Sequence, residues 1–423
     1  MNCETRPALV PDVLIAGAGL SGLAAALGFV RAGFDVIACG TSERTGRGRT
    51  VALLDGSVSF LDSLGLWPLS RGEAAPLRSL RIIDDTGGLF PPRPVEFHAA
   101  EIGLDAFGWN IENDRMAEAL AAEVARASRI ERVASGVAVY AFGADLVRAR
   151  LEDGRPISAR LVIGADGRDS KARRAASLEA RVQAYGQSAL TALLAHRLPH
   201  RDFSTEFHTS GGPFTLVPLP ASAAAPHRSS LVWVMADEDA RRRAALDNED
   251  LAAEIERQSQ SLLGAIRIEG EPGMVYLTRQ IVPRIVARRL VLVGDAAHVF
   301  PPIGAQGLNL GLRDVEAIIA CAVEARDAGR DIGGAEALGA YESSRRPDIA
   351  MRTGVVDGLN RALLARFAPL DFARGAGLAA LAAVGPLRRF VMREGIGPHV
   401  GRRRAKSSTP GFPPAAATDS LPR

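Results

Sequence analysis

The sequence predicts an α/β protein in which a Rossmann-like nucleotide-binding domain is interleaved with a second, β-sheet domain and followed by a helical region. Three observations support this prediction. A glycine-rich turn at residues 17–22 (GAGLSG) follows a short apolar run near the N-terminus. Two later apolar runs end in Gly/Asp turns, at 164–167 and 294–295. The chain between those two turns contains short alternating segments, the pattern of an antiparallel sheet.

The first unit has the pattern of a βαβ motif. Residues 12–16 are apolar, a helical pattern extends to Arg31, and 35–39 form a second apolar run. Glycines at the strand–helix turn permit a tight turn and close approach of the backbone to a pyrophosphate. The N–H groups of the helix N-terminus then face the anion. We predict dinucleotide binding here, with a purely structural turn as the alternative, and the candidate residues are Gly17, Gly19, Ser21 and Gly22.

The second and third turns predict a flavin nucleotide in particular. A carboxylate at a strand end can accept hydrogen bonds from a ribityl chain. A glycine loop that opens a helix presents N–H groups where a reduced flavin carries charge. A long helix is predicted from about 308 to 326. The candidates are Asp166, Gly167, Gly294, Asp295, Gly307, Leu308 and Asn309. The alternative is an ordinary turn with a capping Asp.

The segment between these turns predicts the second domain. Strands are expected at about 188–196, 204–208, 213–218 and 229–235, followed by one charged helix at about 238–260. From 335 to 394 the pattern is helical, with breaks expected at Pro347, Pro369 and Pro386. The predicted division is an FAD-binding domain at 10–67, 106–175 and 285–334, a substrate domain at 68–105 and 176–284, a helical region at 335–400 and a disordered tail at 401–423.

Composition excludes several other classes of protein. A net charge of +3 over 423 residues gives no argument for nucleic-acid binding. Three scattered cysteines form neither a disulfide framework nor a metal cluster, so we expect a reducing cytosol and no metal. There is no signal-peptide pattern and no apolar run of the ~20 residues that a membrane-spanning helix needs. We therefore expect a soluble or membrane-surface protein.

The three motifs, in this order and spacing, resemble the flavoprotein hydroxylases of the para-hydroxybenzoate hydroxylase fold. A narrower resemblance, over about residues 10–400, is to ubiquinone-biosynthesis hydroxylases, which oxidise polyprenylated phenols. The strings that carry it are 47–53 (RGRTVAL), 64–67 (LGLW), 111–113 (IEN), 304–314 (GAQGLNLGLRD), 357–360 (DGLN) and 390–394 (FVMRE), together with Ser57.

This resemblance implies FAD as the cofactor, NAD(P)H as the reductant and O2 as the co-substrate. It implies a C4a-hydroperoxyflavin that transfers a hydroxyl to the ring of a polyprenylated phenol or benzoquinol. The loop residues Pro301, Gly304 and Gln306 would lie beside the flavin ring. Arg49 would lie at the flavin pyrophosphate or nicotinamide, or else be a solvated arginine. Asn113 would lie beside the ribityl chain or pyrophosphate, or else be a helix N-cap.

Two other functions remain open on the sequence. One is an FAD monooxygenase of a small soluble aromatic compound, and the other is a flavin-binding or electron-transfer scaffold that does not hydroxylate. The sequence also departs from the family pattern at Gly40, where the second strand usually ends in an acidic residue that binds the adenosine ribose. Glu43 is the candidate substitute, and we expect weak anchoring of the adenosine. For His298 we expect a role in fixing the shape of the flavin loop, with a catalytic base as the alternative.

The C-terminal segments 362–368 and 372–391 mix apolar residues with arginines. We expect them to pack on the flavin domain, with contact to an anionic membrane surface as an additional role. The resemblance implies a hydrophobic polyprenyl-phenol substrate, other proteins of a quinone-biosynthesis complex as partners, and a cytoplasmic location with peripheral contact to the inner membrane.

Overall fold

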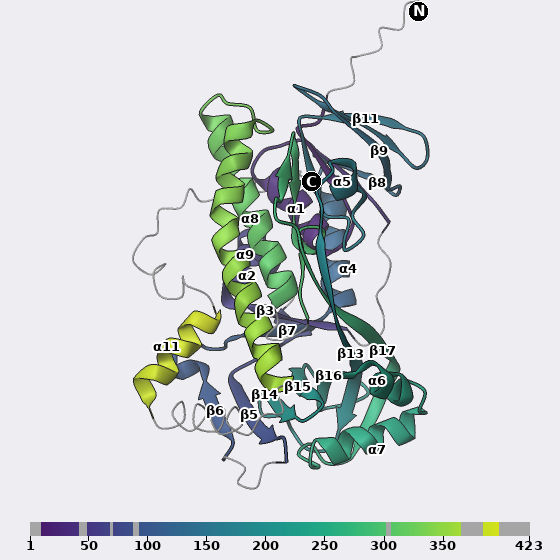
Figure 1. Cartoon of the computed structure of the whole chain (residues 1–423), viewed down its shortest axis with the longest axis vertical. Helices are drawn as coiled ribbons and strands as arrows, with labels where there is room; N and C mark the ends of the chain where they lie inside the picture. Colours follow the sequence, from purple (N-terminus) through teal and green to yellow (C-terminus); the bar gives the residue numbers. More distant parts are fainter. Residues whose placement is uncertain are drawn as a thin grey trace, which may run out of the picture.

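The computed structural model describes residues 10–41, 49–67, 71–87, 93–301, 306–364 and 384–396. The molecule is elongated, with a nucleotide-binding part at one end of the long axis and a β-rich part at the other (Figure 1). The long helix α9 (Ala335–Leu364) runs beside both parts. None of the helices in the described ranges is long and apolar enough to cross a membrane.

A six-stranded sheet forms the centre of the nucleotide-binding part. Its order is β18 (Val286–Ala287), β19 (Leu290–Leu292), β12 (Leu161–Gly164), β1 (Val13–Ala16), β2 (Val36–Cys39) and β8 (Ile130–Val133). From β19 to β8 neighbouring strands pair in parallel. Every residue of β1 and β12 is buried, as expected of parallel strands covered on both faces. The predicted strands and the helix ending at Arg31 are confirmed.

Helices pack against this sheet and against each other. They are α1 (Leu20–Arg31), α4 (Asn113–Arg126), α5 (Lys171–Ala175) and α8 (Gln306–Asp327). α1 contacts both α4 and α8, and α8 contacts α9 and α2 (Asp55–Ser63). Three short 3-10 turns connect other elements, η1 (Arg71–Glu73), η2 (Ala99–Ile102) and η3 (Gly294–Ala296).

Two small sheets flank the main one. One consists of β9 (Val137–Phe142), β10 (Val147–Leu151) and β11 (Pro156–Ala159), and the other of β3 (Thr50–Leu54), β7 (Gly108–Glu112) and β4 (Ala74–Pro76). The second of these lies between the two parts of the molecule, because β7 and β4 also contact β15 (Gly212–Leu219) of the distal sheet.

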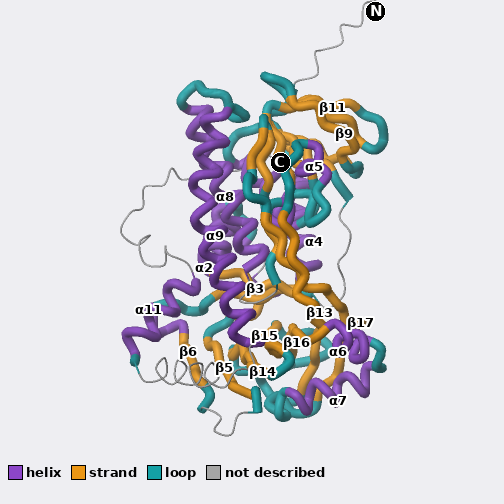
Figure 2. Tube along the Cα trace, viewed as in Figure 1, coloured by secondary structure: helices purple, strands orange, loops and turns teal. Residues whose placement is uncertain are grey.

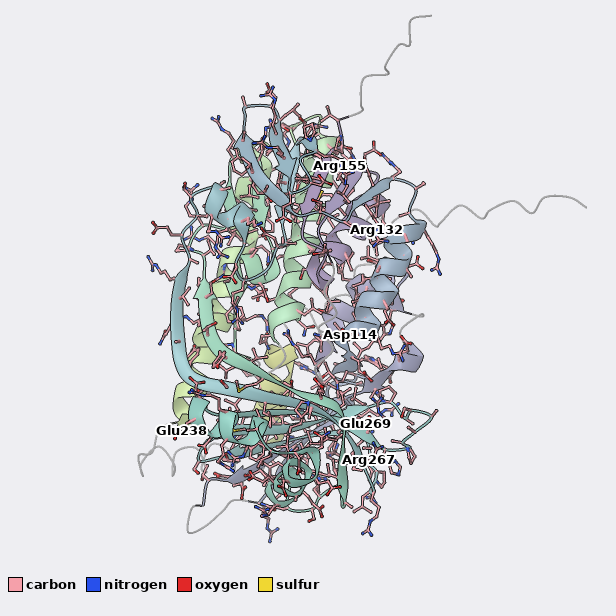
Figure 3. The ribbon with its side chains drawn as sticks, turned by 90° about the vertical axis from the view of Figure 1, so that its right-hand side faces the viewer. Asp114, Arg132, Arg155, Glu238, Arg267 and Glu269 are labelled. Carbon is pink, nitrogen blue, oxygen red and sulfur yellow. The ribbon has the colours of Figure 1, made fainter. Side chains whose placement is uncertain are left out.

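The distal part is an eight-stranded sheet (Figure 2). Its order is β20 (His298–Val299), β17 (Ile266–Ile281), β13 (Arg181–His196), β16 (Arg228–Ala236), β15 (Gly212–Leu219), β14 (Phe203–Thr209), β5 (Ser79–Asp85) and β6 (Val95–His98). All pairs are antiparallel except β14 with β5. β13 and β17 descend from the nucleotide-binding part and bend across the distal part (Figure 3). The fold is thus α/β with two interleaved sheets, as predicted.

The helical layer of the distal sheet differs from the prediction. Instead of one helix at 238–260 there are two, α6 (Asp237–Ala244) and α7 (Asn248–Gln258). The break occurs because Asp247 caps α7, accepting hydrogen bonds from the N–H groups of Glu249 and Asp250. Both helices cover an apolar face of the sheet that includes Phe207 and Trp233.

The predicted break at Pro347 is wrong, because α9 continues through it. Proline removes one N–H and normally kinks a helix. Here Arg345 and Arg352, on either side of the proline, are held by carboxylates of α8 and α9, and this packing keeps the helix in place. Pro386 lies in the first turn of α11 (Gly385–Ile396), where a missing N–H costs little. Pro369 and the tail 401–423 lie outside the described residues.

Candidate FAD site

The three turns predicted from the sequence meet at one edge of the six-stranded sheet. In the parallel register, Ala16 of β1 lies beside Gly164 of β12, and Gly164 lies beside Leu292 of β19. The N–H of Ala165 donates to the carbonyl of Ala16 at 2.8 Å, and that of Val293 donates to Gly164 at 3.0 Å. Nucleotides bind at this kind of strand edge in open α/β sheets.

The glycines of the first turn have two different roles. A side chain at Gly17 (φ +126°) would lie 2.1 Å from the carbonyl oxygen of Ala165, so the first two turns touch. A side chain at Gly22 would lie 2.1 Å from the carbonyl oxygen of Gly17. By contrast, a side chain at Gly19 would meet no atom within 4 Å, and no side chain caps the N-terminus of α1 there. Gly17 and Gly22 permit close packing, whereas Gly19 leaves N–H groups open to an anion.

Buried oxygen atoms without a partner point to a missing polar ligand. Asp166 accepts a hydrogen bond from Ala172 N–H at 3.0 Å through Oδ2, but its Oδ1 is buried and has no partner among the described residues. The same holds for Oδ1 of Asn113. Asp295 is exposed in η3, just after β19, and a side chain at Gly167 would meet no atom within 4 Å. Because orphaned buried acceptors are costly, these atoms fit a ligand rich in hydroxyl groups.

Asn113 and Arg49 come together through strand pairing. β3 pairs with β7, and the N–H of Asn113 donates to the carbonyl of Arg49 at 3.0 Å. The Arg49 side chain is exposed. The N-cap role considered for Asn113 is wrong, because the N-cap of α4 is Glu112 and the Asn113 side chain makes no capping bond. The asparagine is therefore available to a ligand.

Other candidates are engaged by the protein itself. Asn309 is buried, and its side chain accepts from Leu54 N–H at 2.8 Å and donates to Ala52 carbonyl at 2.7 Å, which fastens α8 to β3. Leu308 packs against the main core. The Ser21 hydroxyl lies close to Gly294, between α1 and the third turn. These residues support the site, and their contact with a cofactor stays a prediction.

The loop predicted to lie beside the flavin ring is only partly described. Pro301 is buried at its beginning, and Gly304 lies outside the described residues. At its end, Gln306 accepts a hydrogen bond from Arg352 of α9, while a side chain at Gly307 would meet no atom. The roles of Pro301, Gly304 and Gln306 beside the ring remain predictions.

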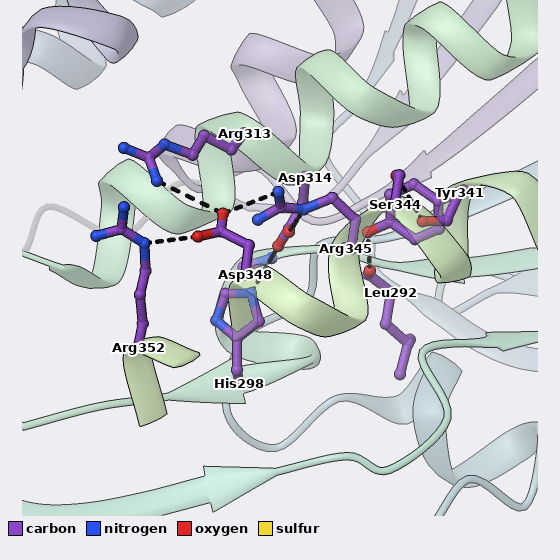
Figure 4. A network of polar contacts seen from close by, with 10 residues as sticks. Leu292, His298, Arg313, Asp314, Tyr341, Ser344, Arg345, Asp348 and Arg352 are labelled. Atoms are coloured by element: carbon purple, nitrogen blue, oxygen red, sulfur yellow. Dashed lines mark hydrogen bonds and ion pairs between the residues drawn. The ribbon is translucent and has the colours of Figure 1, made fainter. Parts of the chain in front are cut away.

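A buried ionic network that the sequence analysis missed holds this loop (Figure 4). At its centre Asp314 of α8, with no exposed surface, lies 2.6 Å from His298 Nε2 and 2.8 Å from Arg345 Nε. It also accepts from the N–H of Gly294 at 3.1 Å. Burial raises the pKa of Asp314, but His298 and Arg345 outweigh burial, and the net pKa is lowered. This geometry supports the loop-fixing role expected of His298.

The network continues along α9 to the start of α8. Asp348 lies 3.0 Å from Arg345 Nη1 and 2.8 Å from Arg352 Nε, and Arg352 reaches Gln306. The signal in the sequence was the spacing of 345, 348 and 352, which puts three charged residues on one helix face. The expected break at Pro347 concealed that signal.

The structure also explains the departure at Gly40. With φ +144°, a side chain at this position would lie 2.9 Å from the backbone nitrogen of Ala18, so the usual acidic residue cannot fit. Glu43 lies outside the described residues. Nearby, burial and the Asp166 carboxylate raise the pKa of Tyr140, whose buried hydroxyl has no partner in the described structure. Tyr140 is a further candidate that the sequence analysis missed. The described side chains contain no cluster of metal-ligating type.

The fold and this edge together define a flavin-binding protein of the Rossmann type. Residues 11–353 match the family model described as the FAD binding domain. The chain therefore belongs to this family, and its cofactor is FAD. The resemblance stated from the three motifs is confirmed.

Two characterised relatives align over most of the chain. The ubiquinone hydroxylase UbiL of Rhodospirillum rubrum is 35% identical over 397 residues, which cover 92% of this chain and 90% of the relative. The 3-demethoxyubiquinol 3-hydroxylase of Escherichia coli is 30% identical over 395 residues, 91% of this chain and 98% of the relative.

Solved structures share the fold. The p-nitrophenol 4-monooxygenase PnpA of Pseudomonas putida superposes with a TM-score of 0.75 at 17% identity, covering 92% of this chain and 98% of that one. HpxO of Klebsiella pneumoniae, complexed with FAD and uric acid, has a TM-score of 0.73 at 21% identity, covering 92% and 97%. At these identities the likeness establishes the fold alone.

Proposed function

We propose that this protein is an FAD-dependent hydroxylase that uses NAD(P)H and O2 to add a hydroxyl to the ring of a polyprenylated phenol or benzoquinol in ubiquinone biosynthesis. The observation that carries this proposal is the similarity to two ubiquinone-pathway hydroxylases over nine-tenths of the chain. The structural likeness to monooxygenases is consistent with it.

The residues of the candidate site divide the work of holding the cofactor. When bound, FAD supplies the activated oxygen. The open N-terminus of α1 at Gly19 would bind the pyrophosphate, and Asp166 and Asp295 would accept hydrogen bonds from hydroxyls of the cofactor. Asn113 and Arg49 would bind the cofactor at the neighbouring edge of the site. The chain's task is then to orient the ring and exclude water.

The distal sheet supplies the other wall of the site. Its face opposite α6 and α7 is joined to the small sheet β3–β7–β4 by Thr50, which donates to Ser230 Oγ at 2.9 Å, and by Asn110, which donates to Pro218 carbonyl at 2.9 Å. This face carries the apolar cluster Ala189, Val234 and Leu277. A mainly apolar wall with a few hydroxyls suits an aromatic ring. We propose that the distal sheet is the substrate domain, with the domain boundaries predicted from the sequence.

Deletion of the gene in the source organism, followed by mass spectrometry of the quinone pool, tests the proposal. We expect a quinone precursor that lacks one hydroxyl to accumulate, and the missing position identifies the carbon that is hydroxylated. An unchanged quinone pool would instead favour a small soluble aromatic substrate. NAD(P)H oxidation by purified enzyme without any hydroxylated product would favour a scaffold.

We also propose that α11 contacts an anionic membrane surface. Three of its apolar side chains, Leu387, Phe390 and Val391, are exposed, with Phe390 the most at 62%, and Val384 just before the helix is exposed as well. Arg389 and Arg393 lie on the same helix. Of the segments expected to pack on the flavin domain, residues 365–383 lie outside the described residues, and α11 contacts the distal part instead. Buried Met392, and Arg388, whose Nε donates to Glu101 at 2.8 Å, fix it against η2 and β6 of the distal part.

Flotation with anionic liposomes tests this contact in the full chain. We expect the double variant Leu387→Asp, Phe390→Asp to lose flotation, because apolar burial and attraction to anionic lipid act together. Val139→Asp, which changes an exposed valine of β9, is the matched control. Undiminished flotation of the double variant, and of a chain ended after Phe367, would rule out α11 as the contact.

A further inference from the structure

Strand β14 carries a buried histidine–glutamate pair that the cofactor site does not use. His208 Nε2 lies 2.9 Å from Glu206 Oε1. The His208 side chain is only 8% exposed and that of Glu206 only 20%. The other ring nitrogen of His208, Nδ1, is buried and has no hydrogen-bond partner in the described part of the chain.

The pair lies on the face of the sheet that is turned toward the nucleotide-binding part. Side chains alternate along a strand, and Phe207, between the two, belongs to the core under α6 and α7. Glu206 and His208 therefore point to the opposite face. In the strand register Glu206 lies beside Thr215 of β15, in the same cross-strand row as Val232. The next row contains Ser230, which binds Thr50.

Helix α9 connects this face to the loop at the flavin. Arg352 of α9 holds Gln306, the first residue of α8, and α9 also contacts β15, the strand next to β14. A helix rises only 1.5 Å per residue. The helix therefore links the end of the flavin loop to the strand next to the one that carries the pair.

The hydrogen bonding assigns the tautomer. Because the Glu206 carboxylate accepts the Nε2–H, the lone pair remains on Nδ1. A buried acceptor without a donor is costly, so Nδ1 is available to accept a hydrogen bond from a ligand. A ring hydroxyl is such a donor. His298 Nδ1 likewise has no partner among the described residues. However, its carboxylate partner Asp314 also binds Arg345 and the N–H of Gly294, so His298 belongs to the network that fixes the loop.

We propose that His208 Nδ1 accepts the proton of the substrate's ring hydroxyl, and that Glu206 stabilises the resulting imidazolium. The O–H bond of the substrate breaks, an N–H bond forms on the imidazole, and the electron pair stays on the ring oxygen. The ring becomes richer in electrons, as an electrophilic hydroxylation requires, while Glu206 remains a carboxylate. This inference rests on the proposed function.

One more titratable group faces the pair from the neighbouring strands. Asp84 of β5 is the register partner of His208 and accepts hydrogen bonds from Thr86. β15 presents Pro213 and Thr215 there, which do not titrate. On α9, Arg345 and Arg352 are both paired with Asp348.

A spectroscopic titration without turnover tests the proposal. The FAD-loaded enzyme, with no NAD(P)H, is mixed with a short-chain prenylated nitrophenol, whose phenolate absorbs in the visible range. We expect the bound probe to ionise at lower pH than the free probe, by about one pKa unit or a tenfold shift in the phenolate ratio. His208→Gln should abolish that shift, and Glu206→Gln should reduce it. His98→Gln, at an exposed histidine of β6, should leave it unchanged.

The possible outcomes distinguish a failure of the role proposed for His208 from a failure of the proposed substrate class. If the pKa of the probe shifts as much in His208→Gln as in the unaltered enzyme, the proposed role of His208 is overturned. Binding of the probe to the unaltered enzyme without a shift would do the same. No binding of the probe at all would contradict the proposed substrate class instead. If His208→Gln does not retain FAD, the Glu206→Gln variant decides, because glutamine keeps the shape and removes only the charge.

Discussion

Replacement of Asp314 by asparagine is the sharpest test of how the FAD site is held. The carboxylate is fully buried and has three partners, His298, Arg345 and the N–H of Gly294. Asparagine has nearly the same volume, so the variant removes charge without creating a cavity. The Arg345 guanidinium, itself 8% exposed, is then left with Asp348 as its carboxylate partner.

The magnitude follows from the number and kind of bonds. Breaking a buried ion pair on one side costs about 3–5 kcal/mol. Asparagine can still accept one hydrogen bond, so we expect the lower end, about 3 kcal/mol. For a chain of this length, with an unfolding entropy of about 2.1 cal/mol/K per residue, each kcal/mol lowers Tm by about 1 °C, which gives a decrease of about 3 °C. Because Asp314 also holds Gly294, we expect weaker retention of FAD.

Urea unfolding and the flavin absorbance per protein chain measure the two effects. Asp327→Asn is the matched control, because Asp327 is 61% exposed and pairs only at the surface with Arg326. An exposed pair of this kind contributes about 0–1 kcal/mol. If Asp314→Asn lost less than about 1 kcal/mol and kept its full complement of FAD, the reasoning about the buried network would be refuted.

Three further predictions concern the same site. Gly17→Ala should lose bound FAD and about 1–3 kcal/mol of stability, because its side chain would lie 2.1 Å from the Ala165 carbonyl oxygen. In Gly19→Ala the added side chain meets no protein atom. This variant should therefore have a lower FAD affinity in a flavin titration, with the unfolding of the FAD-free protein unchanged. FAD should be lost readily during purification, since no acidic side chain fits at Gly40, and an equilibrium titration giving a sub-micromolar Kd would contradict this. The lowered pKa values of Asp314 and Asp348, set by burial against the stronger opposing effect of neighbouring cations, stabilise the fold above the unfolded carboxyl pKa of about 3.9. That stability is lost as pH falls through the folded pKa values, so unfolding free energy should drop steeply in acid, with a shallower slope in Asp314→Asn.

The parts of the site predicted correctly depend on local patterns. Each of the turns at 17–22, 164–167 and 294–295 follows a short apolar run and begins with glycine. Parallel strands bring the turns at their carboxyl ends to one edge of the sheet. The strands and helices around them could be predicted for the same reason. The buried network could not, because Asp314 and Arg345 meet only through the packing of α8 on α9. A local rule about Pro347 even argued against the helix that carries Arg345.

The Glu206–His208 pair shows a second limit. Two residues apart on a strand, they necessarily share a face, and that much the sequence contains. Which face is covered by helices and which is turned toward the flavin depends on the crossing of β13 and β17 between the two parts. The same pattern on the other face would have been an ordinary buried contact.

The order of strands limits how a substrate can reach this face. At one edge of the eight-stranded sheet, β20 leads directly into Phe300 and the flavin loop. Hydrogen bonds through Thr50 and Asn110 fix the middle of the sheet to the small sheet β3–β7–β4. The remaining edge is β5 and β6, against which α11 packs with its exposed apolar side chains. From the strand order we expect a ring that enters from this edge to pass His208 on β14 before it reaches the flavin loop, and we expect a prenyl chain behind it to stay at α11. The proposed membrane contact and the proposed proton acceptor therefore lie along one path, and loss of flotation in the α11 variant should leave the ionisation of a short-chain probe at His208 unchanged.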